Sequence, residues 1–130
     1  MYIWLKAGAS LVIEQTEAMT VIDVNTGSVL KKKKQEDTLF YQINREAAKE
    51  IARQLRLRNI SGIIMIDFIN MKDTAQKEKL LSLLDSECKK DRVPCNVIDM
   101  TALNLVEMTR SKVRKPLHEQ IRSCMKNNRS

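Results

Sequence analysis

With 130 residues, 43% of them hydrophobic and 30% charged, the chain has the size and composition of a single folded domain, which excludes a disordered segment. No apolar run reaches the roughly 18 to 20 residues that a membrane helix needs, and residues 1–10 lack the pattern of a signal peptide, so a cytoplasmic location is expected. The net charge of +7 suits a polyanionic partner, and residues 110–130 carry seven basic residues against a single acidic one.

The first predicted elements are two strands and a long helix. Residues 11–15 and 19–25 are β-branched runs separated by a short polar turn, which is typical of a hairpin. After a polar loop, apolar residues recur at intervals of three and four, which predicts an amphipathic helix over residues 37–58. Residues 63–67 form a continuous apolar run, as in a central strand covered on both faces.

The second half of the chain predicts a helix, a strand and two further helices. Asp73 and Gln76 resemble a capping box, and the helix they open runs to about Lys90. Residues 94–99 read as a strand, residues 101–112 as a helix that starts at a threonine cap, and Pro116 as the first turn of another helix. The expected fold class is α/β: a hairpin followed by strand, helix, strand, helix and strand, in a mixed sheet with helices packed on it.

The thiols and the lone histidine receive no chemical role. Three cysteines without C-x-x-C spacing exclude a disulfide framework and a four-ligand zinc site within one chain. Cys88 and Cys95 fall on apolar faces and are expected in the core, and His118 is expected to be solvated.

Acidic residues at strand ends are the best candidates for chemistry. Asp23 and Asn25 are two residues apart and share one face of their strand, and Asp67 closes the most apolar run of the chain. No lysine or arginine lies within three residues of either aspartate, and a cation such as Mg²⁺ would neutralise them. From the residues alone, this interpretation and simple capping of a turn or helix are about equally supported.

Longer motifs carry more information. They are Glu14-Gln-Thr-Glu-Ala-Met-Thr-Val-Ile-Asp-Val-Asn-Thr-Gly27, Asn44-Arg-Glu-Ala-Ala48, Gly62-Ile-Ile-Met-Ile-Asp-Phe-Ile-Asn-Met71 and Glu107-Met-Thr-Arg110. Together they closely resemble the ribonuclease E/G family, in the DNase I-like subdomain of its catalytic region. The resemblance implies that residues 1–115 form this catalytic subdomain and that residues 116–130 are a basic C-terminal tail or helix.

The resemblance also implies the chemistry. Asp23 and Asp67 match the aspartates that coordinate the catalytic Mg²⁺ in that family, and Asn25 matches the asparagine that supports the site by hydrogen bonding. The expected reaction is Mg²⁺-dependent endonucleolytic hydrolysis of single-stranded RNA, which leaves 5′-phosphate and 3′-hydroxyl ends.

Parts of the family pattern are missing. The S1 module and the 5′-monophosphate sensor that precede this segment in the family are absent from the sequence, so weak activity is expected of the chain alone. The family shares a zinc ion between protomers through a C-P-x-C motif. Cys124-Met-Lys-Asn127 has one cysteine there, so this zinc link is not expected unless it belongs to a longer parent protein.

Basic residues are candidates for contacts with RNA. They are Lys31, Lys32, Lys33 and Lys34 in the loop after the strand that carries Asp23, and Arg110, Lys112, Arg114 and Lys115 further on. Each set also fits a solvated loop or tail. With aromatic residues at 4%, the stacking platforms of dedicated RNA-binding modules are not expected. The alternatives to a ribonuclease are a non-catalytic RNA-binding or assembly module, and a homo-oligomerisation fragment that uses residues 116–125.

Overall fold

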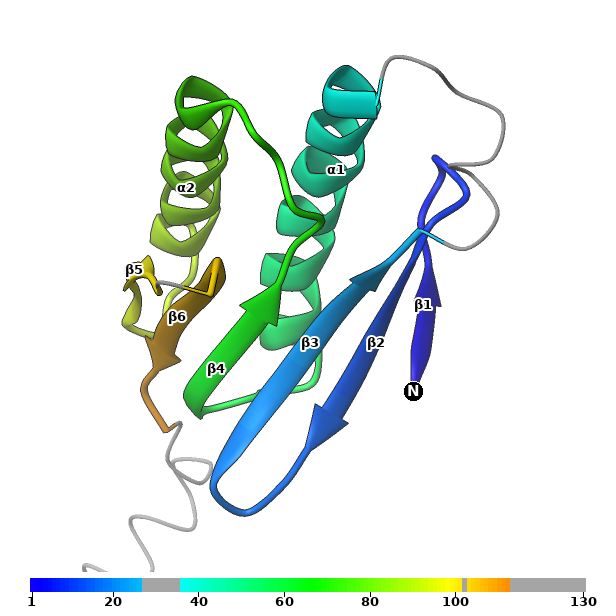
Figure 1. The fold of residues 1–130 in the computed structure, drawn as a ribbon. Coiled ribbons are helices and arrows are strands. Elements are labelled where there is room, and N and C mark those ends of the chain that lie inside the picture. The colour runs from blue at the N-terminus through cyan, green and yellow to red at the C-terminus, as the bar shows by residue number, and fades with distance from the viewer. Residues whose placement is uncertain (27–35, 102, 113–130) are drawn as a thin grey trace, which may run out of the picture.

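The computed structural model describes residues 1–26, 36–101 and 103–112, and the architecture below concerns these residues (Figure 1). They form six strands and two helices. The elements in chain order are β1 (Tyr2–Trp4), β2 (Ser10–Gln15), β3 (Met19–Asn25), α1 (Glu36–Leu57), β4 (Gly62–Asp67), α2 (Thr74–Lys89), β5 (Cys95–Met100) and β6 (Leu105–Arg110). Neither helix combines the length and the hydrophobicity needed to cross a bilayer.

The strands form one mixed sheet in the order β1-β2-β3-β4-β6-β5. β3 and β4 are parallel and are joined through α1, whereas every other neighbouring pair is antiparallel. Both helices lie on the same side of the sheet (Figure 1) and pack against each other. The predicted fold class is confirmed.

The hydrophobic core lies between the sheet and the two helices. In β3, Thr20, Ile22 and Val24 are buried, and the residues between them face the other side of the sheet. The helices contribute fully buried side chains at intervals of four residues: Ile43, Ala47, Ile51 and Leu55 in α1, and Leu80 and Leu84 in α2. Truncation of one such leucine or isoleucine to alanine would cost about 2 to 5 kcal/mol of folding free energy.

The side of the sheet away from the helices is called the open face here. It carries Val21 and Asp23 of β3 together with Ile63, Met65 and Asp67 of β4. β4 is central in the sheet, as predicted, but the described residues cover only one of its faces, because Ile63 is 46% exposed. The apolar run of β4 therefore reflects a half-buried strand in this structure.

The predicted helix over residues 101–112 is wrong, because residues 105–110 form strand β6 between β4 and β5. Val106, Met108 and Arg110 are buried while the residues between them are only half-buried, which is the two-residue period of a strand. The helix predicted at Pro116 lies outside the described residues.

Strand β1 is an element that the sequence analysis did not predict. It pairs with β2 through a tight turn in which Gly8 adopts a left-handed φ of 92°. The backbone N–H groups of Lys6 and Ala7 both donate hydrogen bonds to the Glu46 carboxylate, which joins the turn to α1. This edge strand is thus fixed at its turn end by the helix behind it.

Candidate functional site

Asp23 and Asp67 are neighbours across the one parallel strand pair of the sheet. The register of β3 and β4 places Asp23 directly beside Asp67, at the carboxyl end of each strand. Neighbouring strands lie about 4.8 Å apart, so the two carboxylates reach the same small region of the open face. Asn25 follows two residues after Asp23 on that face. The fold brings all three predicted site residues together.

The electrostatics of this pair are unfavourable without a cation. Partial burial, followed in size by the negative charge of Asp67, raises the pKa of Asp23 above its ordinary value. Within the described part of the chain, no lysine or arginine forms an ion pair with either carboxylate. A bound cation would relieve this repulsion.

The donor set fits a hard divalent cation that is only partly coordinated by protein. Two carboxylates can supply oxygen ligands and the Asn25 amide lies on the same face to hydrogen-bond a water or ligand. Mg²⁺ commonly takes one or two carboxylates, keeps several waters and adds substrate phosphate. The described residues contain no group of three or more His, Cys, Asp or Glu side chains that could enclose a metal. Two carboxylates leave most coordination positions of an octahedral ion such as Mg²⁺ to water and substrate.

A buried asparagine holds the segment that follows Asp67. Asn44 of α1 is fully buried, and its side-chain amide both donates to the backbone carbonyl of Ile69 (2.9 Å) and accepts from the backbone N–H of Ile69 (3.0 Å). Sequence reasoning used Asn44 only as part of a motif. The signal available was a polar residue directly beside Ile43 on the apolar side of the helix.

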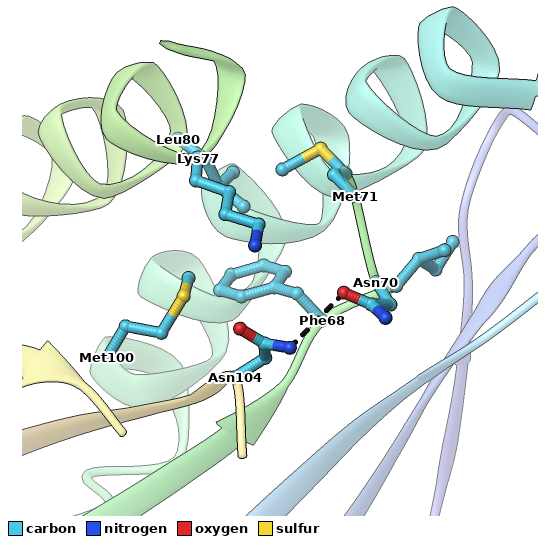
Figure 2. Close-up of a pocket in the computed structure, with 8 residues that line it drawn as sticks. Phe68, Asn70, Met71, Lys77, Leu80, Met100 and Asn104 are labelled. Carbon is cyan, nitrogen blue, oxygen red and sulfur yellow. Dashed lines mark hydrogen bonds between the residues drawn. The ribbon is translucent and has the colours of Figure 1, made fainter. Parts of the chain in front are cut away.

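A small hollow lies beyond the carboxyl end of β4 (Figure 2). Its lining residues are Phe68, Ile69, Asn70, Met71, Lys77, Leu80, Met100 and Asn104. Asn104, with a left-handed φ of 64°, donates a side-chain hydrogen bond to Asn70 (3.3 Å), and the Lys77 side chain extends towards the ring of Phe68. The space has room for about one water-sized group and no carboxylate lines it, so it is not the metal site.

The cysteines in the described residues are part of the core. Cys88 of α2 and Cys95 of β5 are buried and unoxidised. The hydrogen bond with Cys95 and burial raise the pKa of the Cys88 thiol, which suppresses its reactive thiolate form. The hydrogen bond with Cys88 lowers the pKa of the Cys95 thiol, but burial keeps both sulfur atoms away from a substrate in solvent.

The predicted basic residues have different outcomes. Arg110 faces inward, is only 4% exposed, and donates hydrogen bonds to Asp91 (2.8 Å), Asn59 (3.1 Å) and the carbonyl of Ile60 (2.9 Å). Its guanidinium group is thus occupied within the protein, which argues against the expected contact with an RNA phosphate. Lys112 is exposed. Lys31, Lys32, Lys33 and Lys34, as well as Arg114 and Lys115, lie outside the described residues.

The fold and the site together define an α/β domain with two carboxylates at adjoining parallel strand ends, open to solvent and to a ligand. The sequence profile described as Ribonuclease E/G family matches residues 1–113. The chain belongs to this family.

Relatives in several bacteria share this part of the sequence. Ribonuclease G of Escherichia coli (strain K12) is 48% identical over 113 residues, which are 87% of this chain and 23% of that protein. Ribonuclease G of Haemophilus influenzae is 49% identical over 113 residues, again 87% of this chain and 23% of the relative. Ribonuclease E of Nostoc sp. is 41% identical over 115 residues, 88% of this chain and 17% of the relative. The chain thus spans less than a quarter of the length of these relatives.

Proposed function

We propose that this chain is the Mg²⁺-binding catalytic subdomain of an endoribonuclease that cuts single-stranded RNA. The observation that carries the proposal is the register of Asp23 beside Asp67 at the carboxyl ends of two parallel strands. Relatives named ribonuclease G and ribonuclease E, which are similar over nearly the whole described chain, support RNA as the substrate.

The two aspartates and Asn25 have distinct roles in this proposal. Asp23 and Asp67 hold the cation, and Asn25 orients a ligand or water by hydrogen bonding from the same strand face. A bound Mg²⁺ would lower the pKa of a coordinated water and offset negative charge that develops on the phosphate. Attack of water at phosphorus breaks the bond to the 3′ oxygen, which leaves a 5′-phosphate and a 3′-hydroxyl.

Positive charge for the RNA backbone must come from accessible side chains. The proposed contacts are Lys112, which is exposed, and the run Lys31, Lys32, Lys33 and Lys34, which is taken from the sequence because it lies outside the described residues. The buried Arg110 stabilises the fold instead. Such contacts act electrostatically and weaken as salt increases. Because the S1 module and the 5′-monophosphate sensor of the family are not part of this sequence, the chain alone is proposed to bind and cut RNA weakly.

The decisive variant is Asp67→Asn, which removes one carboxylate while keeping its size. It is expected to abolish Mg²⁺ binding, measured by calorimetric titration, and any cleavage of a 5′-phosphorylated single-stranded RNA. Asp85→Asn is the matched control, because Asp85 lies on α2 in an exposed pair with Lys89. Cleavage that persists in Asp67→Asn at the rate of the control would overturn the proposal.

Metal binding can be followed without activity. Mg²⁺ is expected to shift the backbone NMR signals at the ends of β3 and β4, and to leave those of β5 nearly unchanged. If Mg²⁺ shifts neither strand end while RNA still binds in a salt-sensitive way, the chain is a non-catalytic RNA-binding or assembly module.

A further inference from the structure

Two large aromatic side chains stand in solvent on the edge strand β1. Tyr2 is 62% and Trp4 is 74% exposed, although exposed aromatic residues of this size are uncommon on a folded surface. Ile3 between them packs against the core. Because successive side chains of a strand alternate between faces, Tyr2 and Trp4 lie on the open face.

The pairing of the strands aligns these aromatic residues with the candidate metal site. Tyr2 pairs with Val12, Val12 pairs with Asp23, and Asp23 pairs with Asp67, so one row across the open face joins Tyr2 to both carboxylates. The neighbouring row runs from Trp4 through Ser10 to Asn25. β1 and β3 are two strand spacings apart, which is about 10 Å. Adjoining nucleotides of one RNA strand can span this distance.

From this alignment we propose that Trp4 and Tyr2 form a base-stacking platform for the single-stranded RNA whose backbone passes Asp23 and Asp67. The low aromatic content of the sequence did not predict such a platform, which depends on where the fold places these two residues. The inference rests on the proposed function for the identity of the ligand. Aromatic side chains on a sheet commonly stack bases of single-stranded nucleic acid, and the stacking tolerates different base sequences.

The chemistry of the open face favours bases over phosphates at this position. Glu14 and Val21 form the next row beside Asp23, so the surface next to the carboxylates is acidic and apolar. Phosphates are repelled there unless a cation is bound, whereas uncharged bases are not. The exposed Lys6 lies just past Trp4 and can meet a phosphate on the outer side of the platform.

The platform is held in position before any ligand binds. Leu5 is buried, its N–H donates to the carbonyl of Ala9 (2.8 Å), and the adjoining turn is bound by Glu46. At the other end of β1, the carbonyl of Met1 accepts from the N–H of Ile13 (2.9 Å). A rigid platform loses little conformational entropy on binding, which favours affinity.

Trp4 provides its own probe, because it is the single tryptophan of the sequence. The full chain is titrated in Mg²⁺ with a 5′-phosphorylated single-stranded oligonucleotide that has a non-cleavable backbone, and tryptophan fluorescence is recorded. Saturable quenching is expected. An abasic oligonucleotide of equal length and charge is expected to leave the fluorescence unchanged at the same concentrations.

Variants test the energy of stacking with a labelled oligonucleotide and fluorescence anisotropy. Trp4→Ala is expected to weaken binding about five- to a hundredfold, and Trp4→Phe to restore most of the loss. Leu57→Ala is the control, because Leu57 is also exposed (63%) but belongs to α1. Circular dichroism establishes whether each variant is folded. If Trp4→Ala does not fold, the fluorescence titration of the unmodified chain tests the proposal instead.

Three results would contradict the proposal of a stacking platform. The first is no quenching, whether the oligonucleotide fails to bind or binds without reaching Trp4. The second is equal quenching by the abasic oligonucleotide. The third is a Trp4 signal that depends on protein concentration alone, with matching dimers in sedimentation, since a second copy would then cover the face.

The outcome is separable from that of the proposed function. Asp67→Asn is expected to lose Mg²⁺ binding and cleavage but to keep base-dependent quenching at raised oligonucleotide concentration. Quenching without any effect of Asp67 on cleavage would retain the platform and reject the metal site. Loss of cleavage in Asp67→Asn, together with no quenching of Trp4 in the unmodified chain, would retain the metal site and reject the platform.

Discussion

Asn44 binds Ile69 through both backbone groups of that residue, with its amide nitrogen 2.9 Å from the carbonyl oxygen and its amide oxygen 3.0 Å from the backbone nitrogen. This pair joins α1 to the segment that begins directly after Asp67. The end of β4 is otherwise followed by a stretch without regular structure before α2 begins. Asn44 therefore restricts the position of the strand end at which the Asp67 carboxylate lies.

Asn44→Ala is expected to lower the free energy of unfolding by about 2 to 4 kcal/mol, since it leaves a backbone donor and a backbone acceptor without partners. Urea denaturation measures this loss. Gln42→Ala is the control, because Gln42 is an exposed residue of the same helix and should change stability little. An unchanged unfolding midpoint in Asn44→Ala would contradict the structural role of the pair.

The buried ion pair between Arg110 and Asp91 is expected to be a major contribution to stability. Their side chains are only 3% and 5% exposed, and Arg110 also bonds Asn59 and Ile60. Asp91→Asn should cost about 3 kcal/mol, because it leaves a buried guanidinium group without its counter-charge. Asp85→Asn, which breaks the exposed pair with Lys89, should cost at most about 0.5 kcal/mol.

The same pair predicts a dependence of stability on pH. Burial alone would raise the pKa of Asp91, but hydrogen bonds from Arg110 and from the Val93 N–H hold the pKa below its ordinary value of 3.8. A lowered pKa in the folded state means that the stabilisation is complete at pH values above 3.8 and is lost as the pH falls through the folded pKa. Thermal unfolding of the unmodified chain and of Asp91→Asn should therefore differ at neutral pH and converge in acid. A constant difference down to strong acid would contradict this assignment.

Removing one carboxylate of the candidate metal site should stabilise the metal-free protein. Because the pKa of Asp23 is raised in the folded state, its charged form opposes folding at neutral pH, and this penalty disappears as the pH falls below 3.8. Asp23→Asn is expected to gain at most about 1 kcal/mol in the presence of a chelator, the size of a like-charge repulsion in water. Differential scanning calorimetry measures the gain.

Addition of Mg²⁺ should reverse that order. The melting temperature of the unmodified chain is expected to rise with Mg²⁺ concentration, because a ligand that binds only the folded state stabilises it, and that of Asp23→Asn is expected to change little. Equal effects of Mg²⁺ on both proteins would show that the ion binds elsewhere.

Much of the site followed from local sequence. The apolar runs that precede Asp23 and Asp67, with a helical pattern between them, predict two parallel strands joined by a helix, and such strands end at the same edge of a sheet. The side-chain period of two placed Asn25 with Asp23. The motifs around these residues identified the Ribonuclease E/G family, which the comparison confirms.

Other features depended on partners far away in the chain. Residues 105–110 form a strand because β4 and β5 offer hydrogen bonds on both sides, and the short β1 exists because β2 pairs with it. Arg110 belongs to a basic segment in the sequence, yet its side chain is buried because it donates hydrogen bonds to Asp91 and Asn59.

The order of apolar and polar residues along the chain determined the fold class and the choice of Asp23 and Asp67 as candidate site residues. Both follow from side-chain periods of two to four residues. The tertiary structure decided which neighbours each side chain meets: that Asp23 lies beside Asp67, that Asn44 holds Ile69, and that Tyr2 shares a row with the carboxylates. Such contacts join residues distant in sequence, and strand register and helix packing determine them only when the whole chain folds.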